Sequence, residues 1–177
     1  CYTAERDEIY DFSSPYYLRQ IKAVVREDSD FANITALSQF DGMKPTVIAQ
    51  LGTNFVDYKD QIPSAVPATD YEAASELFLA IQNKTADVLI TEKSTADSAF
   101  NTMTGLVQLE MDPSDDFVAP EGNPNTCCIL FRGGDSLCQI IQGAMDEMGW
   151  TADTEEGLKA MNDLMTEMIS LQPSAGE

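Results

Sequence analysis

The sequence predicts an α/β fold with mainly parallel sheets, because short apolar runs of strand length alternate with longer segments of helical period. The predicted strands are 21–25, 45–51, 86–91 and 127–131, and the predicted helices are 70–83, 135–149 and 154–171. A chain of 177 residues fits one domain or two small lobes, and its 44% apolar content is enough for a hydrophobic core.

The first part of the chain contains two of these strands and one helix. Ile21, Ala23 and Val25 alternate with the residues between them, and PTVIAQL at 45–51 is a compact apolar run; both patterns are typical of strands. Behind Asp70, which is the predicted N-cap, apolar residues recur at helical spacing. These residues are Tyr71, Ala74, Leu77, Phe78 and Ile81.

The second part begins with two further strands, ADVLIT at 86–91 and CCILF at 127–131. Two amphipathic helices follow, and Gly149 is the predicted stop of the first. Their apolar positions are Leu137, Ile140, Ile141, Ala144, Met145 and Met148 in the first helix, and Leu158, Met161, Leu164, Met165 and Met168 in the second. We expect these methionine-rich faces to pack in the core.

Composition narrows the function classes. Ten basic and thirty acidic side chains give a formal charge of −20, which repels nucleic-acid phosphates and anionic headgroups. The absence of histidine argues against serine-triad and zinc catalysis and favours a binding function. The four cysteines lack CxxC metal spacing, so the sequence predicts no particular disulfide, and no run is long enough to span a bilayer.

Five segments then follow one another in an informative order. TAERDEIYDFSSPYY (3–17) precedes IKAVVRED (21–28), LGTN (51–54), ADVLITE (86–92) and FRGGD (131–135). This order resembles the extracellular solute-binding proteins of family 3, which serve amino-acid ABC importers. The resemblance covers essentially the whole chain, and TxER followed by DFSxPYY is its most specific part.

The resemblance implies a periplasmic-binding-protein-like fold of type II, with two α/β lobes joined by two crossover strands and the ligand held between the lobes. It assigns residues 1–20 to lobe 1, residues 21–120 to lobe 2 and residues 121–177 to the C-terminal part of lobe 1. The family's first lobe opens with several β/α units before TxER. These are absent here, so we expect the N-terminal part of lobe 1 to be missing.

The resemblance also implies which residues bind a ligand carboxylate. Arg6 takes the place of the family's carboxylate-binding arginine, and a planar guanidinium is the bidentate partner for that group. The alternative is that Arg6 pairs with acidic neighbours on the surface. Cys1 matches a position where relatives often have a small polar residue facing the carboxylate, whereas we expect Thr3 to stabilise the turn.

The remaining predicted ligand contacts come from the central segments and the first motif. Gly52, Thr53 and Asn54 follow an apolar strand and precede a predicted helix, where unpaired N–H groups favour an anion; the alternative is that Thr53 and Asn54 only cap the helix. Glu92 takes the place of an aspartate that binds the ligand ammonium in relatives, or is a solvated loop charge. Tyr16 is expected to contact ligand at the cleft entrance.

The expected function is the substrate-binding component of an ABC importer, which binds a polar small molecule, an amino acid above all, and delivers it to a permease without a cofactor or metal. The full-length protein is expected to be exported to the cell surface or periplasm and lipid-anchored. Two alternatives stay open: an enzyme on the same scaffold, dehydratase-like or murein-cleaving, and an extracellular sensor domain. A truncated lobe would also expose a sheet edge for a swapped or edge-paired dimer.

Overall fold

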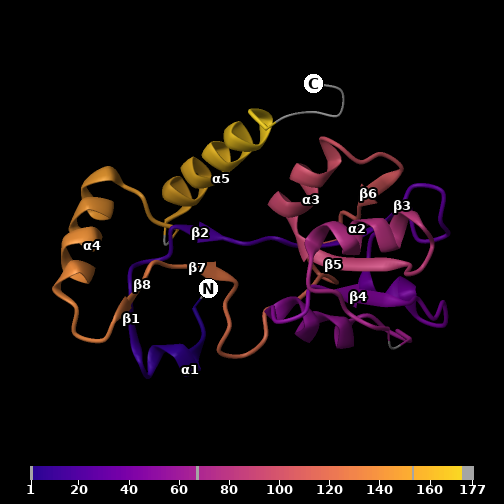
Figure 1. The fold of residues 1–177 in the computed structure, drawn as a ribbon, viewed down its shortest axis with the longest axis horizontal. Helices are drawn as coiled ribbons and strands as arrows, with labels where there is room; N and C mark the ends of the chain where they lie inside the picture. Colours follow the sequence, from indigo (N-terminus) through magenta and orange to yellow (C-terminus); the bar gives the residue numbers. More distant parts are fainter. Residues whose placement is uncertain (1, 67, 153, 173–177) are drawn as a thin grey trace. The chain divides into compact units, whose positions relative to one another are not determined.

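The computed structural model describes residues 2–66, 68–152 and 154–172, so Cys1 lies outside the described residues. The chain divides into two compact units (Figure 1). Of the described residues, unit 1 contains those within 2–20 and 119–171, and unit 2 contains those within 21–118 together with Gln172. Among the described residues, no helix is both long enough and apolar enough to cross a membrane.

Unit 2 is built on a four-stranded sheet with the order β4-β5-β3-β6. The strands are β3 (Ile21–Arg26), β4 (Val47–Ala49), β5 (Val88–Glu92) and β6 (Leu106–Gln108). The strands expected at 21–25, 45–51 and 86–91 are therefore confirmed, although β4 is only the middle of its apolar run. Strand β4 pairs with β5 in parallel, whereas β3 runs antiparallel to both β5 and β6.

The expectation of mainly parallel sheets is wrong for the described residues, in which β4 and β5 form the only parallel pair of strands. Parallel neighbours need a crossover connection. Helix α2 (Ala74–Gln82) supplies one between β4 and β5. Strand β3 enters the sheet directly from unit 1, without such a helix, and takes the opposite direction.

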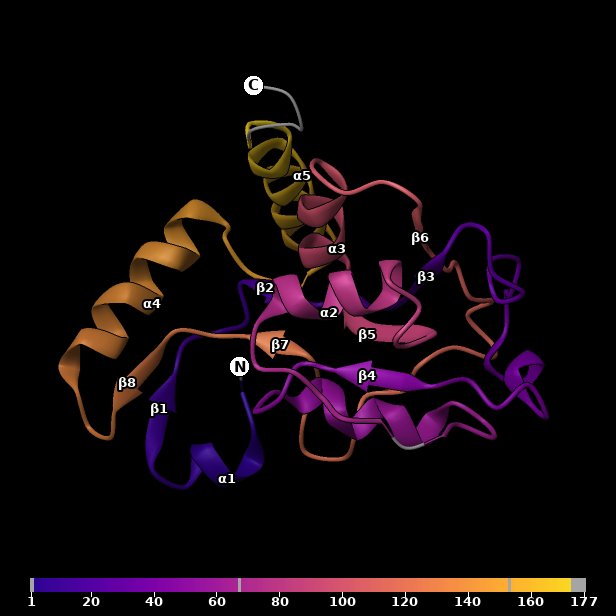
Figure 2. The same ribbon diagram turned by 45° about the vertical axis from the view of Figure 1, so that its right-hand side comes forward.

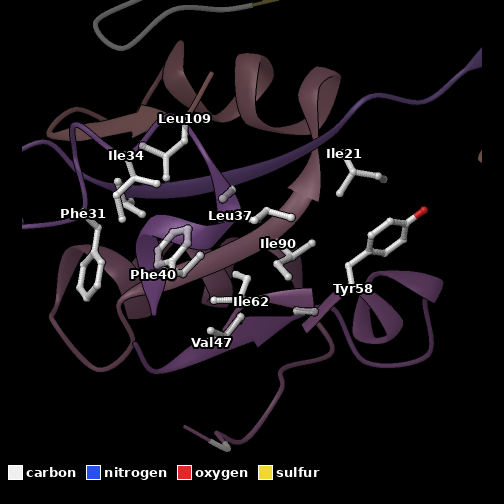
Figure 3. Packing of buried hydrophobic residues seen from close by; sticks show 14 of the residues in the cluster. Ile21, Phe31, Ile34, Leu37, Phe40, Val47, Tyr58, Ile62, Ile90 and Leu109 are labelled. Atoms are coloured by element: carbon white, nitrogen blue, oxygen red, sulfur yellow. The ribbon is translucent and has the colours of Figure 1, made fainter. Parts of the chain in front are cut away.

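Each face of this sheet has its own hydrophobic cluster, because neighbouring side chains along a strand point to opposite faces. Helices α2 and α3 (Lys93–Phe100) cover one face of the sheet (Figure 2). Val24 and Leu89 are fully buried in the cluster on that face. The 3₁₀ helices η1 (Leu37–Phe40) and η2 (Asn54–Gln61) contribute Phe40 and Tyr58 to the other cluster, which includes Ile90 (Figure 3).

The helix expected over 70–83 begins later than predicted, at Ala74, with Ala73 in the N-cap position. Asp70 is not its N-cap. The backbone of Tyr71 is held extended beside the sheet, because its carbonyl accepts a 2.8 Å hydrogen bond from Leu51 N–H and it forms a parallel bridge with Gln50. Asp70 instead bonds to β4 and to η2, as described below.

The described part of unit 1 contains two short antiparallel ladders and three helices. Its elements are α1 (Ala4–Asp7), β1 (Tyr10–Phe12), β2 (Tyr17–Leu18), β7 (Thr126–Cys127), β8 (Leu130–Arg132), α4 (Ser136–Met148) and α5 (Glu155–Ser170). Strand β1 pairs with β8, and β2 pairs with β7.

The single strand expected at 127–131 is wrong, because the run divides into β7 and β8 with different partners. The break lies opposite Ser13, whose N–H donates to Ile129 O and whose hydroxyl accepts from Ile129 N–H, both at 3.0 Å. Pro15, which has no N–H to donate, follows in the partner segment and separates β1 from β2. One apolar run therefore serves two ladders.

Both helices expected in the last part of the chain are confirmed. Asp135 caps α4 by accepting a 2.9 Å hydrogen bond from Leu137 N–H, and Gly149 ends the helix with a φ of +63°. The expected burial of their methionine-rich faces holds only in part. Met145 and Met161 are buried, but Met148 and Met168 are 63% and 54% exposed.

Candidate functional site

The candidate site lies in unit 2, at the carboxyl edge of the parallel pair β4 and β5. Ala49 is the last residue of β4 and pairs with Ile90, so the loop that follows β4 reaches the same edge as Glu92. Strand β3 begins there too, because Ile21 pairs with Glu92. The fold thus brings together the loop 51–54 and Glu92, at the edge where open α/β sheets bind ligands.

The loop after β4 is a tight turn with its own internal hydrogen bonds. Thr53 N–H donates to Gln50 O at 3.3 Å, and Gly52 has a φ of +76°, which the third position of a type II turn requires. Thr53 caps η2 by accepting from Phe55 N–H at 3.3 Å, and its hydroxyl donates to Gln50 O at 2.7 Å. The capping role expected of Thr53 is confirmed, and the Thr53 hydroxyl proton is donated to Gln50 O within the loop.

The loop can still offer backbone donors to an anion. Gly52 is exposed, a side chain at this position would meet no atom within 4 Å, and no described residue accepts a hydrogen bond from its N–H. Asn54 is half-buried and begins η2. The predicted helix is therefore present as a 3₁₀ helix, and its amino end faces the same edge of the sheet as the turn.

Glu92 is half-buried at the end of β5, in the position just before α3. Its Oε1 accepts hydrogen bonds from Ser94 Oγ at 2.7 Å and Thr95 Oγ1 at 3.4 Å. Among the described residues, no donor reaches Oε2. The neighbouring Lys93 pairs with Asp97, one turn further along α3. The carboxylate is thus oriented by hydroxyl groups through Oε1, and Oε2 could accept a hydrogen bond from a cationic group.

Two further predicted site residues, Arg6 and Tyr16, belong to unit 1. Arg6 is exposed on the single turn of α1, which Thr3 caps by accepting from Arg6 N–H at 3.3 Å. The neighbouring Asp7 accepts a 3.1 Å hydrogen bond from the Tyr2 hydroxyl, which raises the pKa of Tyr2 above 10.0.

Tyr16 lines a small apolar pocket within unit 1, and Arg6 is not part of that pocket. The pocket has a volume of about 150 Å³ and is otherwise lined by Tyr17, Trp150, Met161, Leu164, Met165 and Met168. Cys1 lies outside the described residues. The structure therefore groups the loop and Glu92 in unit 2, and leaves the roles of Arg6, Tyr16 and Cys1 as sequence-based predictions.

Sequence reasoning missed the residues that support the site. Ser94 and Thr95 orient Glu92, and the sequence signal for them is the run of hydroxyl residues directly after the acidic residue. Lys59 and Asp70 form an ion pair at 2.7 Å, a partnership that spacing along the chain does not reveal. No cluster of three or more His, Cys, Asp or Glu side chains in the described ranges is arranged to hold a metal ion.

No protein-family model matches the chain, and no curated protein matches its sequence. Solved structures do match. A crystal structure of the substrate-binding protein of an amino acid ABC transporter superposes with a TM-score of 0.68 at 21% identity, covering 93% of this chain and 67% of that one. An L-arginine-bound substrate-binding protein from Streptococcus pneumoniae gives 0.70 at 22% identity, covering 97% and 65%.

An ancestral arginine-binding protein bound to glutamine also superposes, with a TM-score of 0.65 at 22% identity, covering 92% of this chain and 66% of that protein. The chain therefore spans about two thirds of the length of the solved structures that it matches. Nearly all of the chain takes part in each match. The chain has the type II fold of the substrate-binding proteins of amino acid ABC transporters.

Proposed function

We propose that this chain is the substrate-binding component of an ABC importer and that its ligand is an amino acid. The observation that carries the proposal is the carboxyl edge of β4 and β5, where the turn at 50–53 and the oriented carboxylate of Glu92 meet. A fold shared with substrate-binding proteins of amino acid transporters supports it.

The chemistry of the edge suits a zwitterion. An amino acid presents an ammonium and a carboxylate a few ångströms apart, and a site for both needs an anionic acceptor and separate donors. Glu92 Oε2 supplies the acceptor, and the exposed Gly52 N–H supplies a donor. We propose that Arg6, from unit 1, supplies the bidentate donors for the carboxylate, as the motif TAER predicts.

The ligands of the matched structures point to the same class. One matched protein is bound to L-arginine and another to glutamine. Glu92 is one methylene longer than the aspartate expected at this position, so we propose that the ligand amine lies further from the strand end than in relatives. Asn54 is proposed to contact the ligand, and Tyr16 and Cys1 to border it; Thr53 contributes through the turn that it holds.

The whole-protein properties follow from the same proposal. We propose that the protein works outside the cell or in the periplasm, held by a lipid anchor, and passes its ligand to a membrane permease. We propose binding without chemical conversion, so an amino acid incubated with the chain should be recovered unchanged by mass spectrometry. Recovery of a dehydrated or cleaved product would favour the enzyme alternative.

Calorimetric titration of the 177-residue chain with L-arginine, L-glutamine and their deaminated analogues tests the proposal. Arg6→Ala should weaken binding by about 2–5 kcal/mol, because a charge-assisted pair is lost. Glu92→Gln should weaken the amino acids and leave the deaminated analogues within about threefold, a change below roughly 1 kcal/mol. Arg132→Ala and Glu76→Gln remove exposed charges of the same type in the same units and are the matched controls.

Binding of neither amino acid by the wild-type chain would contradict the proposal. Equal loss for amino acids and deaminated analogues in Glu92→Gln would show that Glu92 does not recognise the amine. An Arg6→Ala variant with the affinity of Arg132→Ala would mean that Arg6 is only a surface charge.

A further inference from the structure

We infer that Asp70 is a positioning residue, which orders the turn at 50–53 from outside and so sets ligand affinity without touching the ligand. The ligand half of this inference rests on the proposed function. The structural half concerns only the turn and can be measured on its own.

One oxygen of Asp70 connects the two sides of the turn. Asp70 Oδ1 accepts a 2.8 Å hydrogen bond from Ala49 N–H, at the end of the strand that enters the turn. The same oxygen accepts from Lys59 Nζ at 2.7 Å, on the 3₁₀ helix that leaves it. Both side chains are largely shielded from water, with exposed fractions of 16% for Lys59 and 12% for Asp70. Such a shielded pair is less weakened by salt than a surface pair.

The two residues after Asp70 continue this support along the backbone. Tyr71 O accepts from Leu51 N–H at 2.8 Å, and Glu72 O accepts from the Gln50 side chain at 2.9 Å. Segment 70–72 therefore accepts three hydrogen bonds from the first half of the turn: from Ala49 N–H just before it, from Leu51 N–H and from the Gln50 side chain.

The turn needs this external support because it has little of its own. Leu51 and Gly52 are exposed, and a Cβ added at Gly52 would meet no atom within 4 Å outside its chain neighbours. The turn closes on itself through Thr53, with a backbone bond of 3.3 Å and a hydroxyl bond of 2.7 Å to Gln50 O. A glycine in a loop retains many alternative conformations, so contacts from outside decide which one is populated.

The same strand provides a matched control at its other end. Asp87 Oδ2 accepts from Thr46 N–H at 2.9 Å, just before β4, whereas Asp70 accepts from Ala49 N–H at its end. Asp87→Ala removes an equivalent carboxylate-to-backbone bond from the same strand but leaves the turn untouched.

Amide hydrogen exchange of the 177-residue chain decides the structural half. Asp70→Ala should accelerate exchange at Ala49, Leu51 and Thr53 by tenfold or more, relative to Leu89 in the sheet. Asp87→Ala should accelerate Thr46 and leave Leu51 and Thr53 within threefold of wild type. If Asp70→Ala accelerates only Ala49, the residue is a local hydrogen-bond acceptor and the inference is overturned.

Calorimetry with L-arginine and L-glutamine decides the ligand half. Whichever of the two the wild type binds should be bound at least tenfold more weakly by Asp70→Ala and within threefold by Asp87→Ala. A disordered turn with unchanged affinity overturns the link to ligand binding. If the wild type binds neither amino acid, the proposed function fails while the exchange measurement still decides the role of Asp70.

A second variant keeps the test informative if Asp70→Ala fails to fold. Asp70→Asn combined with Lys59→Met retains an oxygen acceptor for Ala49 N–H and leaves no unpaired buried charge. The inference predicts that this double variant protects Leu51 and Thr53 better than Asp70→Asn alone, which leaves the shielded Lys59 ammonium without a carboxylate. Equal protection in the two variants would also overturn it.

Discussion

Alanine at Gly157 should destabilise unit 1, although alanine is normally the better helix former. Gly157 is buried in the first turn of α5. A Cβ built on it lies 1.9 Å from the carbonyl oxygen of Thr151 and 3.0 Å from Thr154 Oγ1. The nearest obstacle is backbone, and Ala152 N–H donates to Pro15 O, which restrains the segment that would have to move.

The magnitude follows from two opposing effects. Replacing a helical glycine by alanine is worth about 1 kcal/mol of helix stability. Overpacking costs about 1–3 kcal/mol, and a contact of 1.9 Å against backbone belongs at the upper end of that range. We therefore expect a net loss of roughly 2 kcal/mol in the free energy of unfolding.

Gly143 provides the matched control. It lies in the middle of α4, also in unit 1, and a Cβ there meets nothing within 4 Å. Gly143→Ala should therefore stabilise the unit by about 0.5–1 kcal/mol. Urea unfolding followed by tryptophan fluorescence, excited at a wavelength that tyrosine does not absorb, reports on this unit because the chain's single tryptophan, Trp150, lies in it. A Gly157→Ala variant as stable as wild type would refute the close approach of Thr151.

Two further predictions concern unit 2. Phe40 is fully buried and stacks on Phe31 at a ring-centroid distance of 5.9 Å. Phe40→Ala should therefore lower the free energy of unfolding by about 3–5 kcal/mol, measured by chemical unfolding, and a decrease below about 1 kcal/mol would contradict its place in the core. Lys84 lowers the pKa of Asp28 below 3.8. The ionised Asp28 carboxylate therefore stabilises the folded state at pH values above the unfolded-state pKa of Asp28, and this contribution is lost as the pH falls through the folded-state pKa. Lys84→Met should raise the pKa of Asp28 in an NMR titration, and an unchanged titration would exclude this ion pair.

The local elements are where the sequence predicted most. The 3.6-residue period and the stop at Gly149 located α4 nearly to the residue, because a C-cap depends on a few adjacent groups. The order of five motifs predicted the fold that the solved structures share. Glu92 and the loop 51–54 could be singled out because strand ends in such folds carry ligand groups.

The strand pairing and the contacts that hold the turn at 50–53 depended on the tertiary structure. The run 127–131 is uniformly apolar, so its division between two ladders follows from where Ser13 and Pro15 lie in the partner segment. The predicted cap Asp70 became the partner of Ala49 and Lys59, which are 21 and 11 residues away.

Period, adjacent polar groups and motif order were therefore enough to predict helices α2, α4 and α5, the fold class and the candidate ligand groups, whereas the short α1 and α3 were not predicted. Only the tertiary structure decided strand direction, the burial of α4 and α5, and the residues that hold the turn at 50–53. Backbone carbonyl and carboxylate groups accept a hydrogen bond from any donor that the fold brings within reach, so the spacing of residues along the chain does not predict which donor each acceptor will bind.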